Sequence, residues 1–261
     1  MEVHAHTHTA RKKWTHYFWE FFMLFLAVTL GFFVENKREH YIEHKRADAF
    51  AESMHNDLVD DTAFIGPLLK RYEMAAACVD TFINLMAGND DPKKIPGGKL
   101  YWYGLWGGFL NPFASNDATF QQMKNSGSLR YFQNRELTVN IGRYDQLVRK
   151  VMMLIDQDIP VYIETRKARS KIFDFRYNKT ANDITRSMYD AWAYDKPFDQ
   201  SRIDSFTTIN FPLLTYDRTV LNEYVELCRS RILAALVSNI KLLLLASTEL
   251  IMELKKEYHL K

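Results

Sequence analysis

Three residues near the start of the chain have the types and spacing of a zinc-peptidase motif. His40, Glu43 and His44 match the H-x-x-E-H order of inverted zinc peptidases. On a helix, the two histidines would share one face at i and i+4, as zinc ligands must, and the glutamate beside them could act as a base. No third ligand can be identified, and the surrounding sequence is a charge-rich stretch with little to form a cleft. We favour a stalk without bound metal and keep a membrane-tethered zinc metalloenzyme as the rival hypothesis.

Other residues that could do chemistry are sparse. His4, His6 and His8 alternate at the N-terminus and could capture a transition metal, although a solvated tail explains them better. Cys78 and Cys228 are the only cysteines. They are typical of buried free thiols, and a disulfide in an oxidising compartment is the alternative. The sequence contains no phosphate loop, no dinucleotide-binding glycine pattern and no G-x-S-x-G elbow. We therefore expect no cofactor and no enzyme activity.

The most informative segment is an apolar run over residues 14–34. As a helix it would be about 30 Å long at roughly 1.5 Å per residue, which matches the hydrocarbon core of a bilayer. Trp14 and Trp19 lie at its start, where amphipathic rings favour the headgroup level. No small-residue cleavage site follows, so we predict a transmembrane signal-anchor and not a cleaved signal peptide.

A carboxylate, Glu20, lies in the first turns of this membrane helix. An ionisable group there is costly to bury unless it is paired, which makes it a candidate contact to a partner protein or to His16, one turn earlier. The alternative is that it sits at the headgroup level and reaches water. We therefore treat Trp14, Trp19 and Glu20 as candidate membrane or partner contacts.

The short tail before the anchor, residues 1–13, ends in Arg11, Lys12 and Lys13. Lysine and arginine also follow the span, so their count alone does not decide the orientation. A short basic tail is nevertheless the usual form of a signal-anchor whose tail stays in the cytosol. We expect a cytosolic N-terminus and a domain on the opposite side.

Beyond the anchor, the sequence predicts helices joined by short loops. Apolar residues recur at near-helical spacing over residues 35–66, so the membrane helix should continue as a stalk until Pro67 breaks it. The domain then covers residues 67–261. We expect its helices over 68–86, from 118 to about 125, over 134–173 with a kink or division at Pro160, around 184–193 and over 217–258, with residues 175–212 otherwise irregular. The leucine run 242–246 is flanked by charges and too short to span, which favours a core helix.

The predicted fold class is therefore all-α: an N-terminal transmembrane helix continuing into a stalk helix, followed by an antiparallel helical bundle. One segment of the domain, residues 99–113, is dense in aromatic residues. Tyr101, Trp102 and Trp106 in it form a candidate interaction patch, although such segments are more often core.

Two stretches resemble an uncharacterised family of single-pass bacterial inner-membrane proteins. EFFMLFLAVTLGFFVEN (residues 20–36) is similar to the family's N-terminal anchor. NDATFQQMKNSGSLRYFQNRELTVNIGRYDQL (residues 116–147) is similar to an internal segment in which an acidic-Ala-x-Phe helix precedes a Ser-Gly break and a further helix. The resemblance implies the same layout and a place in the bacterial inner membrane, with a periplasmic domain, and it implies no activity.

These observations lead to an expected function in binding. A net charge of +2 is too small to indicate a nucleic-acid partner. We expect a membrane-anchored scaffold or accessory subunit that contacts other membrane or periplasmic proteins, as a homo-oligomer or as part of a complex. A ligand-sensing domain is the alternative, and it would need a partner for output because the cytosolic tail is so short.

Overall fold

The computed structural model of the chain describes residues 14–260, and every regular element in that range is helical. The eight α-helices within it are α1 (Trp14–Ala87), α2 (Gly97–Leu105), α3 (Ala118–Ser126), α4 (Arg135–Ile172), α5 (Phe175–Ala193), α6 (Ser201–Thr208), α7 (Arg218–Arg229) and α8 (Leu233–Tyr258). Short 3-10 turns, η1 (Pro92–Lys94), η2 (Trp106–Gly108) and η3 (Ser128–Tyr131), lie between some of them. The predicted all-α class is confirmed, and the predicted tail, residues 1–13, lies outside the described residues.

The chain divides into two compact units at Phe50–Ala51, and α1 contributes residues to both. In the first unit, an 18-residue window of α1 has a mean hydropathy of 1.9 and no buried residue, so it is long and apolar enough to span a membrane. This division lies earlier in the chain than the boundary at residue 66 that we predicted between stalk and domain. Leu58 and Ile65, expected in the stalk, are 2% and 0% exposed and belong to the core of the second unit.

The predicted helix break at Pro67 is wrong, because α1 continues through it to Ala87. Proline removes one N–H from a helix, but the break can be overridden when packing holds the flanking turns. Ile65 and Leu68 on either side are both buried. The helix ends where the glycine signal predicts, and the Gly88 N–H donates to the Asn84 carbonyl at 2.9 Å.

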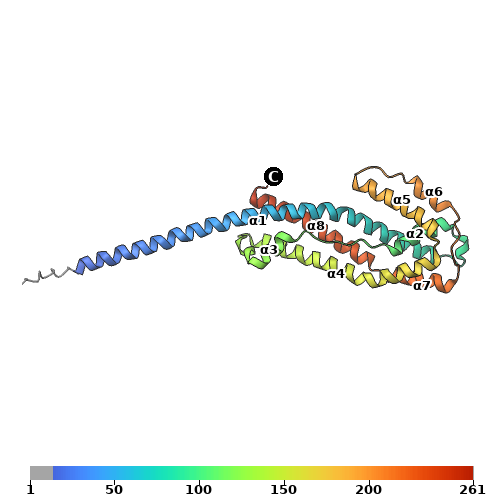
Figure 1. The fold of residues 1–261 in the computed structure, drawn as a ribbon, viewed down its shortest axis with the longest axis horizontal. Helices are drawn as coiled ribbons and strands as arrows, with labels where there is room; N and C mark the ends of the chain where they lie inside the picture. Colours follow the sequence, from blue (N-terminus) through green and yellow to red (C-terminus); the bar gives the residue numbers. More distant parts are fainter. Residues whose placement is uncertain (1–13, 261) are drawn as a thin grey trace, which may run out of the picture. The chain divides into compact units, whose positions relative to one another are not determined.

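The second unit is built on long helices, among which α4 and α8 pack extensively against each other (Figure 1). Asn140 on α4 donates to Glu253 on α8 at 2.7 Å, whereas Asp158 on α4 pairs with Arg231, just before α8 begins. The two helices are therefore antiparallel, as predicted. Pro160 lies inside α4 without dividing it.

The last predicted helix, over residues 217–258, is divided in the structure into α7 and α8. The interruption comes at Arg231, whose fully buried side chain turns inward to Asp158. The α7–α8 stretch also contains a window of mean hydropathy 1.6, long and apolar enough for a span, of which 33% is buried. Leu243 and Leu250 in the leucine-rich part are 0% and 1% exposed, so this part contributes to the core.

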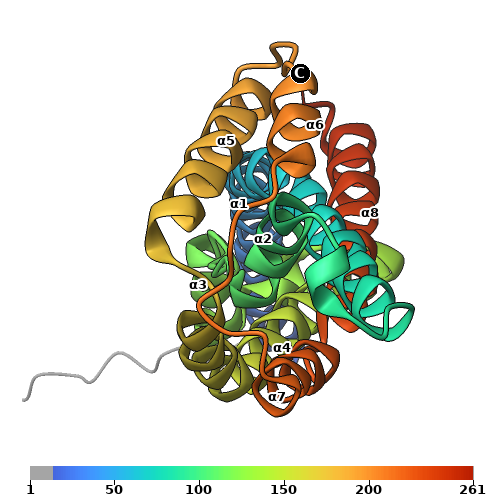
Figure 2. The same ribbon diagram turned by 90° about the vertical axis from the view of Figure 1, so that its right-hand side faces the viewer.

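The remaining helices pack around the far end of the unit. α2 contacts both α5 and α6 (Figure 2). The region over 175–212 is more regular than predicted, because Asp174 caps α5 by accepting the Arg176 N–H at 2.9 Å and the helix runs for 19 residues. α3 ends at Gly127 with a left-handed φ of 69°, as the Ser-Gly stop predicts.

Two carboxylates on α1 hold the segment that precedes α3. Asp61 accepts hydrogen bonds from the Asn116 N–H at 2.7 Å and from the Tyr144 hydroxyl at 2.5 Å. Asp57 accepts the Thr119 N–H at 3.2 Å, in the first turn of α3. The segment 116–147, which carries the family resemblance, is therefore fixed to α1 by buried and part-buried hydrogen bonds and has a structural role.

Candidate functional site

The motif at His40, Glu43 and His44 lies on α1 in the first unit. His40 Nδ1 is 3.7 Å from Glu43 Oε2, and both side chains are exposed. Within residues 14–260, no group of three or more His, Cys, Asp or Glu side chains is placed to hold a metal ion. The structure therefore adds no third ligand to this motif, and the zinc hypothesis gains no support from it.

The candidate contacts at the start of α1 are exposed side chains. Trp14 and Trp19 are 81% and 59% exposed. Glu20 Oε1 lies 3.2 Å from His16 Nε2, so the intrahelical partner that we considered is within reach. A contact to another protein at Glu20 stays a prediction.

The aromatic patch predicted at Tyr101, Trp102 and Trp106 is not a surface patch. The three side chains are 0%, 2% and 1% exposed. The Tyr101 hydroxyl donates to the Pro212 carbonyl at 2.9 Å and accepts the Asp174 N–H at 2.8 Å, so it braces the link between α4 and α5. Aromatic rings with a satisfied polar end are more favourable inside than on the surface. Trp106 alone also lines a cavity, described below.

Both cysteines are free and buried, so the disulfide alternative is not formed. Burial raises the pKa of the Cys78 thiol to about 12 and that of the Cys228 thiol, also mainly by burial, to about 12. Neither thiol is therefore a nucleophile at neutral pH.

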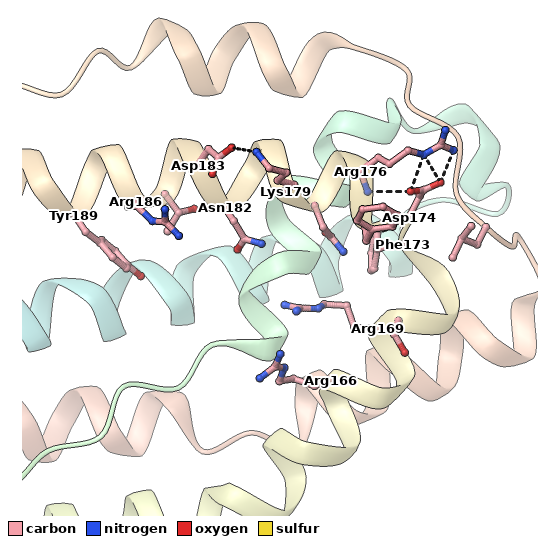
Figure 3. Close-up of a pocket in the computed structure, with 15 residues that line it drawn as sticks. Arg166, Arg169, Phe173, Asp174, Arg176, Lys179, Asn182, Asp183, Arg186 and Tyr189 are labelled. Carbon is pink, nitrogen blue, oxygen red and sulfur yellow. Dashed lines mark hydrogen bonds and ion pairs between the residues drawn. The ribbon is translucent and has the colours of Figure 1, made fainter.

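The second unit has an open groove of about 1160 Å³ between the end of α4 and α5, which we call the basic groove (Figure 3). The two walls follow each other directly, because α4 ends at Ile172 and α5 begins at Phe175. Helical spacing places side chains three or four positions apart on one face. The groove is lined by polar and charged side chains, chiefly Arg166, Arg169, Asn178, Lys179, Asn182, Thr185, Arg186 and Tyr189.

The charge in the basic groove is predominantly positive. Five cationic side chains and two carboxylates line it. Asp174 pairs with Arg176 at 2.6 Å, and this hydrogen bond lowers the pKa of Asp174, while Asp183 pairs with Lys179 at 3.0 Å. Among the groove residues, this leaves Arg166, Arg169 and Arg186 without a carboxylate partner in the lining.

A smaller hollow of about 320 Å³, which is also open to solvent and which we call the inner chamber, shares residues with the basic groove. Arg166, Arg169, Asn182, Thr185 and Tyr189 line both. The inner chamber is completed by the segment around η2: Leu105, Trp106, Gly108, Phe109, Leu110 and Asn111, together with Tyr162. In Figure 3, Arg166 and Arg169 on α4 and Asn182 on α5 project into the space between the two helices, whereas Tyr189 lies over α1, where the Arg71 guanidinium carbon is 4.5 Å from its ring centroid.

The η2 segment is held in place by hydrogen bonds from a buried ion pair. Arg231 donates to both carboxylate oxygens of Asp158 and also to the carbonyls of Gly107 and Phe109, the latter at 2.6 Å. The side chains of Arg231 and Asp158 are both 0% exposed. Gly107 allows η2 to pack closely against α7, since a Cβ there would lie 2.5 Å from the sulfur of Cys228.

Three buried polar groups of the inner chamber have no hydrogen-bond partner within the described part of the chain. They are Trp106 Nε1, Asn111 Nδ2 and the Tyr189 hydroxyl. Burial raises the pKa of Tyr189, so its hydroxyl stays protonated and able to donate at neutral pH. A buried donor without an acceptor costs about 1–3 kcal/mol, so each of these groups needs an acceptor from water or from a ligand.

This site offers positive charge and hydrogen-bond donors. The lining of the inner chamber contains arginine, tyrosine, tryptophan, amide and hydroxyl groups, and no histidine, cysteine, aspartate or glutamate. Arg169 donates to the Leu105 carbonyl at 2.9 Å, and burial lowers its pKa from the ordinary value. The lining can therefore bind an anion and orient it, but it holds no side chain suited to proton transfer near neutral pH.

Sequence reasoning missed this site. The stretch 165–171, TRKARSK, carries a usable signal, because its basic residues recur within two turns of a predicted helix. The other wall of the groove is α5, and most of its sequence was expected to be irregular. The packing of α5 beside the end of α4 could therefore not be predicted. Comparisons of the chain with protein-family models, curated proteins and solved structures find no match.

Proposed function

We propose that the chain is a membrane-anchored binding protein that acts as a scaffold or accessory subunit by recognising an acidic partner protein in the basic groove. The observation that carries this proposal is the surplus of guanidinium groups at Arg166, Arg169 and Arg186 in an open groove of about 1160 Å³. Arginine is suited to carboxylate recognition because its planar fork can bind both oxygens at once.

The membrane anchor in this proposal is the apolar part of α1 in the first unit. An exposed apolar surface of this length is unfavourable in water, whereas lipid would cover it. In the proposed topology the N-terminus is cytosolic and the helical unit lies in the periplasm, anchored in a bacterial inner membrane.

Carbonate washing of membranes tests the anchor. The full chain should stay in the membrane pellet, and its recovery in the supernatant would contradict the anchor. Single-cysteine labelling tests the topology. In intact spheroplasts, a membrane-impermeant thiol reagent should label Asp90→Cys and not Thr9→Cys, and the native thiols should give little background because both are buried. The opposite pattern would place the helical unit in the cytosol.

The groove is tested by binding of a fluorescein-labelled oligoglutamate peptide to the full-length protein in a non-ionic detergent. We expect anisotropy to report binding that weakens as ionic strength rises, since Arg166 and Arg186 are exposed charges. Arg186→Glu should weaken binding about tenfold or more by replacing an attractive contact with a repulsive one.

Lys241→Glu is the matched control, because Lys241 is an exposed cation on α8 outside the groove lining. It changes the net charge by the same amount and should leave peptide binding close to that of the wild type. Equal losses in the two variants would mean that the peptide responds to overall charge, and the groove would lose its role as the recognition site.

The second candidate function is ligand sensing, in which occupancy of the inner chamber would be passed to a partner protein. The specific observation that favours it is the group of unpaired buried donors around that chamber. A small ligand fits a hollow of about 320 Å³ and can supply acceptors to such donors.

A further inference from the structure

We propose that the inner chamber binds a phosphate dianion, either as free phosphate or as the head of a small phosphomonoester. The proposal concerns the chamber alone and does not depend on an acidic protein partner in the basic groove. It rests on three buried donor atoms that lack a hydrogen-bond partner within the described residues, Trp106 Nε1, Asn111 Nδ2 and the Tyr189 hydroxyl, and on Arg166 and Arg169, which line the same cavity.

The donor inventory favours phosphate over carboxylate. Tryptophan donates one hydrogen bond, tyrosine one and the asparagine amide two, and the two guanidinium groups add more. A carboxylate has two acceptor oxygens and one negative charge, whereas a phosphate monoester has three terminal oxygens and a charge of about −1.5 to −2 at neutral pH. Two guanidinium groups without a carboxylate in the lining match that charge.

The arginine side chains are already oriented before a ligand arrives. Arg169 donates to the Leu105 carbonyl at 2.9 Å, and Arg166 donates to the Tyr162 hydroxyl at 2.9 Å. Tyr162 also lies under Arg231, 5.6 Å from its guanidinium carbon to the ring centroid. Such preorganisation lowers the entropy cost of binding, because few rotamers have to be fixed when the ligand enters.

The size of the chamber indicates a small compound. Its volume of about 320 Å³ is at the lower end of the roughly 300–1,000 Å³ found for small-molecule sites. Through the shared residues it continues into the basic groove, where Asn178 Oδ1 is a buried acceptor without a partner in the described chain. An organic remainder with hydroxyl groups could donate to it. The chamber would hold the phosphate, and the groove would hold the remainder.

Isothermal titration calorimetry on the full-length protein in a non-ionic detergent tests the proposal with four probes: inorganic phosphate, glucose 6-phosphate, glucose and glucuronate. We expect the two phosphates to bind, glucose not to bind, and glucuronate, which carries a carboxylate in place of the phosphoryl group, to bind at least tenfold more weakly. Absence of phosphate binding would overturn the proposal, and so would glucuronate binding as tightly as inorganic phosphate. Tighter binding of glucose 6-phosphate than of inorganic phosphate assigns the site to a phosphomonoester, and the reverse order assigns it to free phosphate.

Trp106→Phe tests the location, because it removes the indole N–H and keeps an aromatic ring. We expect phosphate binding to weaken about tenfold, the value of one hydrogen bond to a charged acceptor. Trp102→Phe is the matched control, since Trp102 is also buried but lines neither cavity. Tyr189→Phe gives a second readout if Trp106→Phe fails to fold. Unchanged phosphate binding in a folded Trp106→Phe or Tyr189→Phe variant would remove the site from the inner chamber.

The two proposals fail in different experiments. Loss of phosphate binding in Trp106→Phe together with unaltered peptide binding in Arg186→Glu supports the chamber and overturns the acidic-partner proposal. Normal phosphate binding in Trp106→Phe together with weakened peptide binding in Arg186→Glu overturns the chamber and leaves the acidic-partner proposal in place.

Discussion

The buried pair Arg231–Asp158 gives a quantitative prediction for Asp158→Asn. This substitution keeps the side-chain shape but removes the charge that balances the fully buried guanidinium group of Arg231. The Arg231 nitrogens lie 2.5–2.9 Å from the Asp158 carboxylate oxygens. Breaking a buried ion pair by neutralising one partner costs about 3–5 kcal/mol, because the other charge is left without compensation. Since domains have total stabilities of about 5–15 kcal/mol, this loss is a large fraction.

Urea titration of the full-length protein in a non-ionic detergent, followed by circular dichroism, measures the effect. With m-values of about 1–3 kcal/mol/M, the expected loss lowers the midpoint by at least about 1 M. Asp156→Asn is the control, because Asp156 is an exposed carboxylate on the same helix and its loss should change stability by less than about 0.5 kcal/mol.

The double substitution Asp158→Leu with Arg231→Met separates charge imbalance from packing. It removes both charges, so it should recover much of the stability lost in Asp158→Asn. The carbonyls of Gly107 and Phe109 would still lack a donor, and recovery should therefore be incomplete. A stability of Asp158→Asn within about 1 kcal/mol of the wild type would refute this reasoning, since the guanidinium would then be compensated by groups other than the carboxylate.

Three further predictions concern other parts of the chain. Tyr144→Phe removes the hydroxyl that donates to Asp61 at 2.5 Å and should cost about 1.5–3 kcal/mol in the same urea titration. Burial raises the pKa of the Cys78 and Cys228 thiols from 9.0 to about 12, so the unfolded chain loses these protons at lower pH than the folded protein. The stability that the protonated thiols contribute is therefore complete below pH 9.0 and is lost as pH rises toward about 12. Melting temperatures measured across that pH range should fall accordingly. Glu20→Lys should weaken self-association or partner binding in detergent without lowering the melting temperature of the helical unit, as measured by analytical ultracentrifugation and thermal unfolding.

Local signals in the sequence predicted the helix ends well. The side chain of Asn134 accepts the Glu136 N–H at 3.0 Å and caps α4 where the helix was expected to start. Gly127 and Gly88 follow α3 and α1 at the predicted stops. These signals depend on a few neighbouring residues, so they can be interpreted without knowing what packs against the helix.

Structural features that depend on residues distant in the sequence could not be predicted from such local signals. Pro67 does not break α1, because buried neighbours hold its flanking turns in the helix. Arg231 interrupts an otherwise continuous helical pattern by turning inward to Asp158. Because Asp158 lies 73 positions earlier, the local sequence around Arg231 does not reveal this pairing. The inner chamber was missed for the same reason, since it joins the segment around Trp106 to side chains on α4 and α5.

The connection between α4 and α5 has a consequence for the order in which the site is assembled. The two walls of the basic groove are consecutive helices separated only by Phe173 and Asp174, so their contact is local and closes a short loop. The floor of the inner chamber comes from η2, which contacts α4 across a long separation in sequence. Local contacts form faster than distant ones during folding. The cationic walls can therefore associate early, whereas the unpaired donors of Trp106 and Asn111 reach the chamber only when the chain is nearly native.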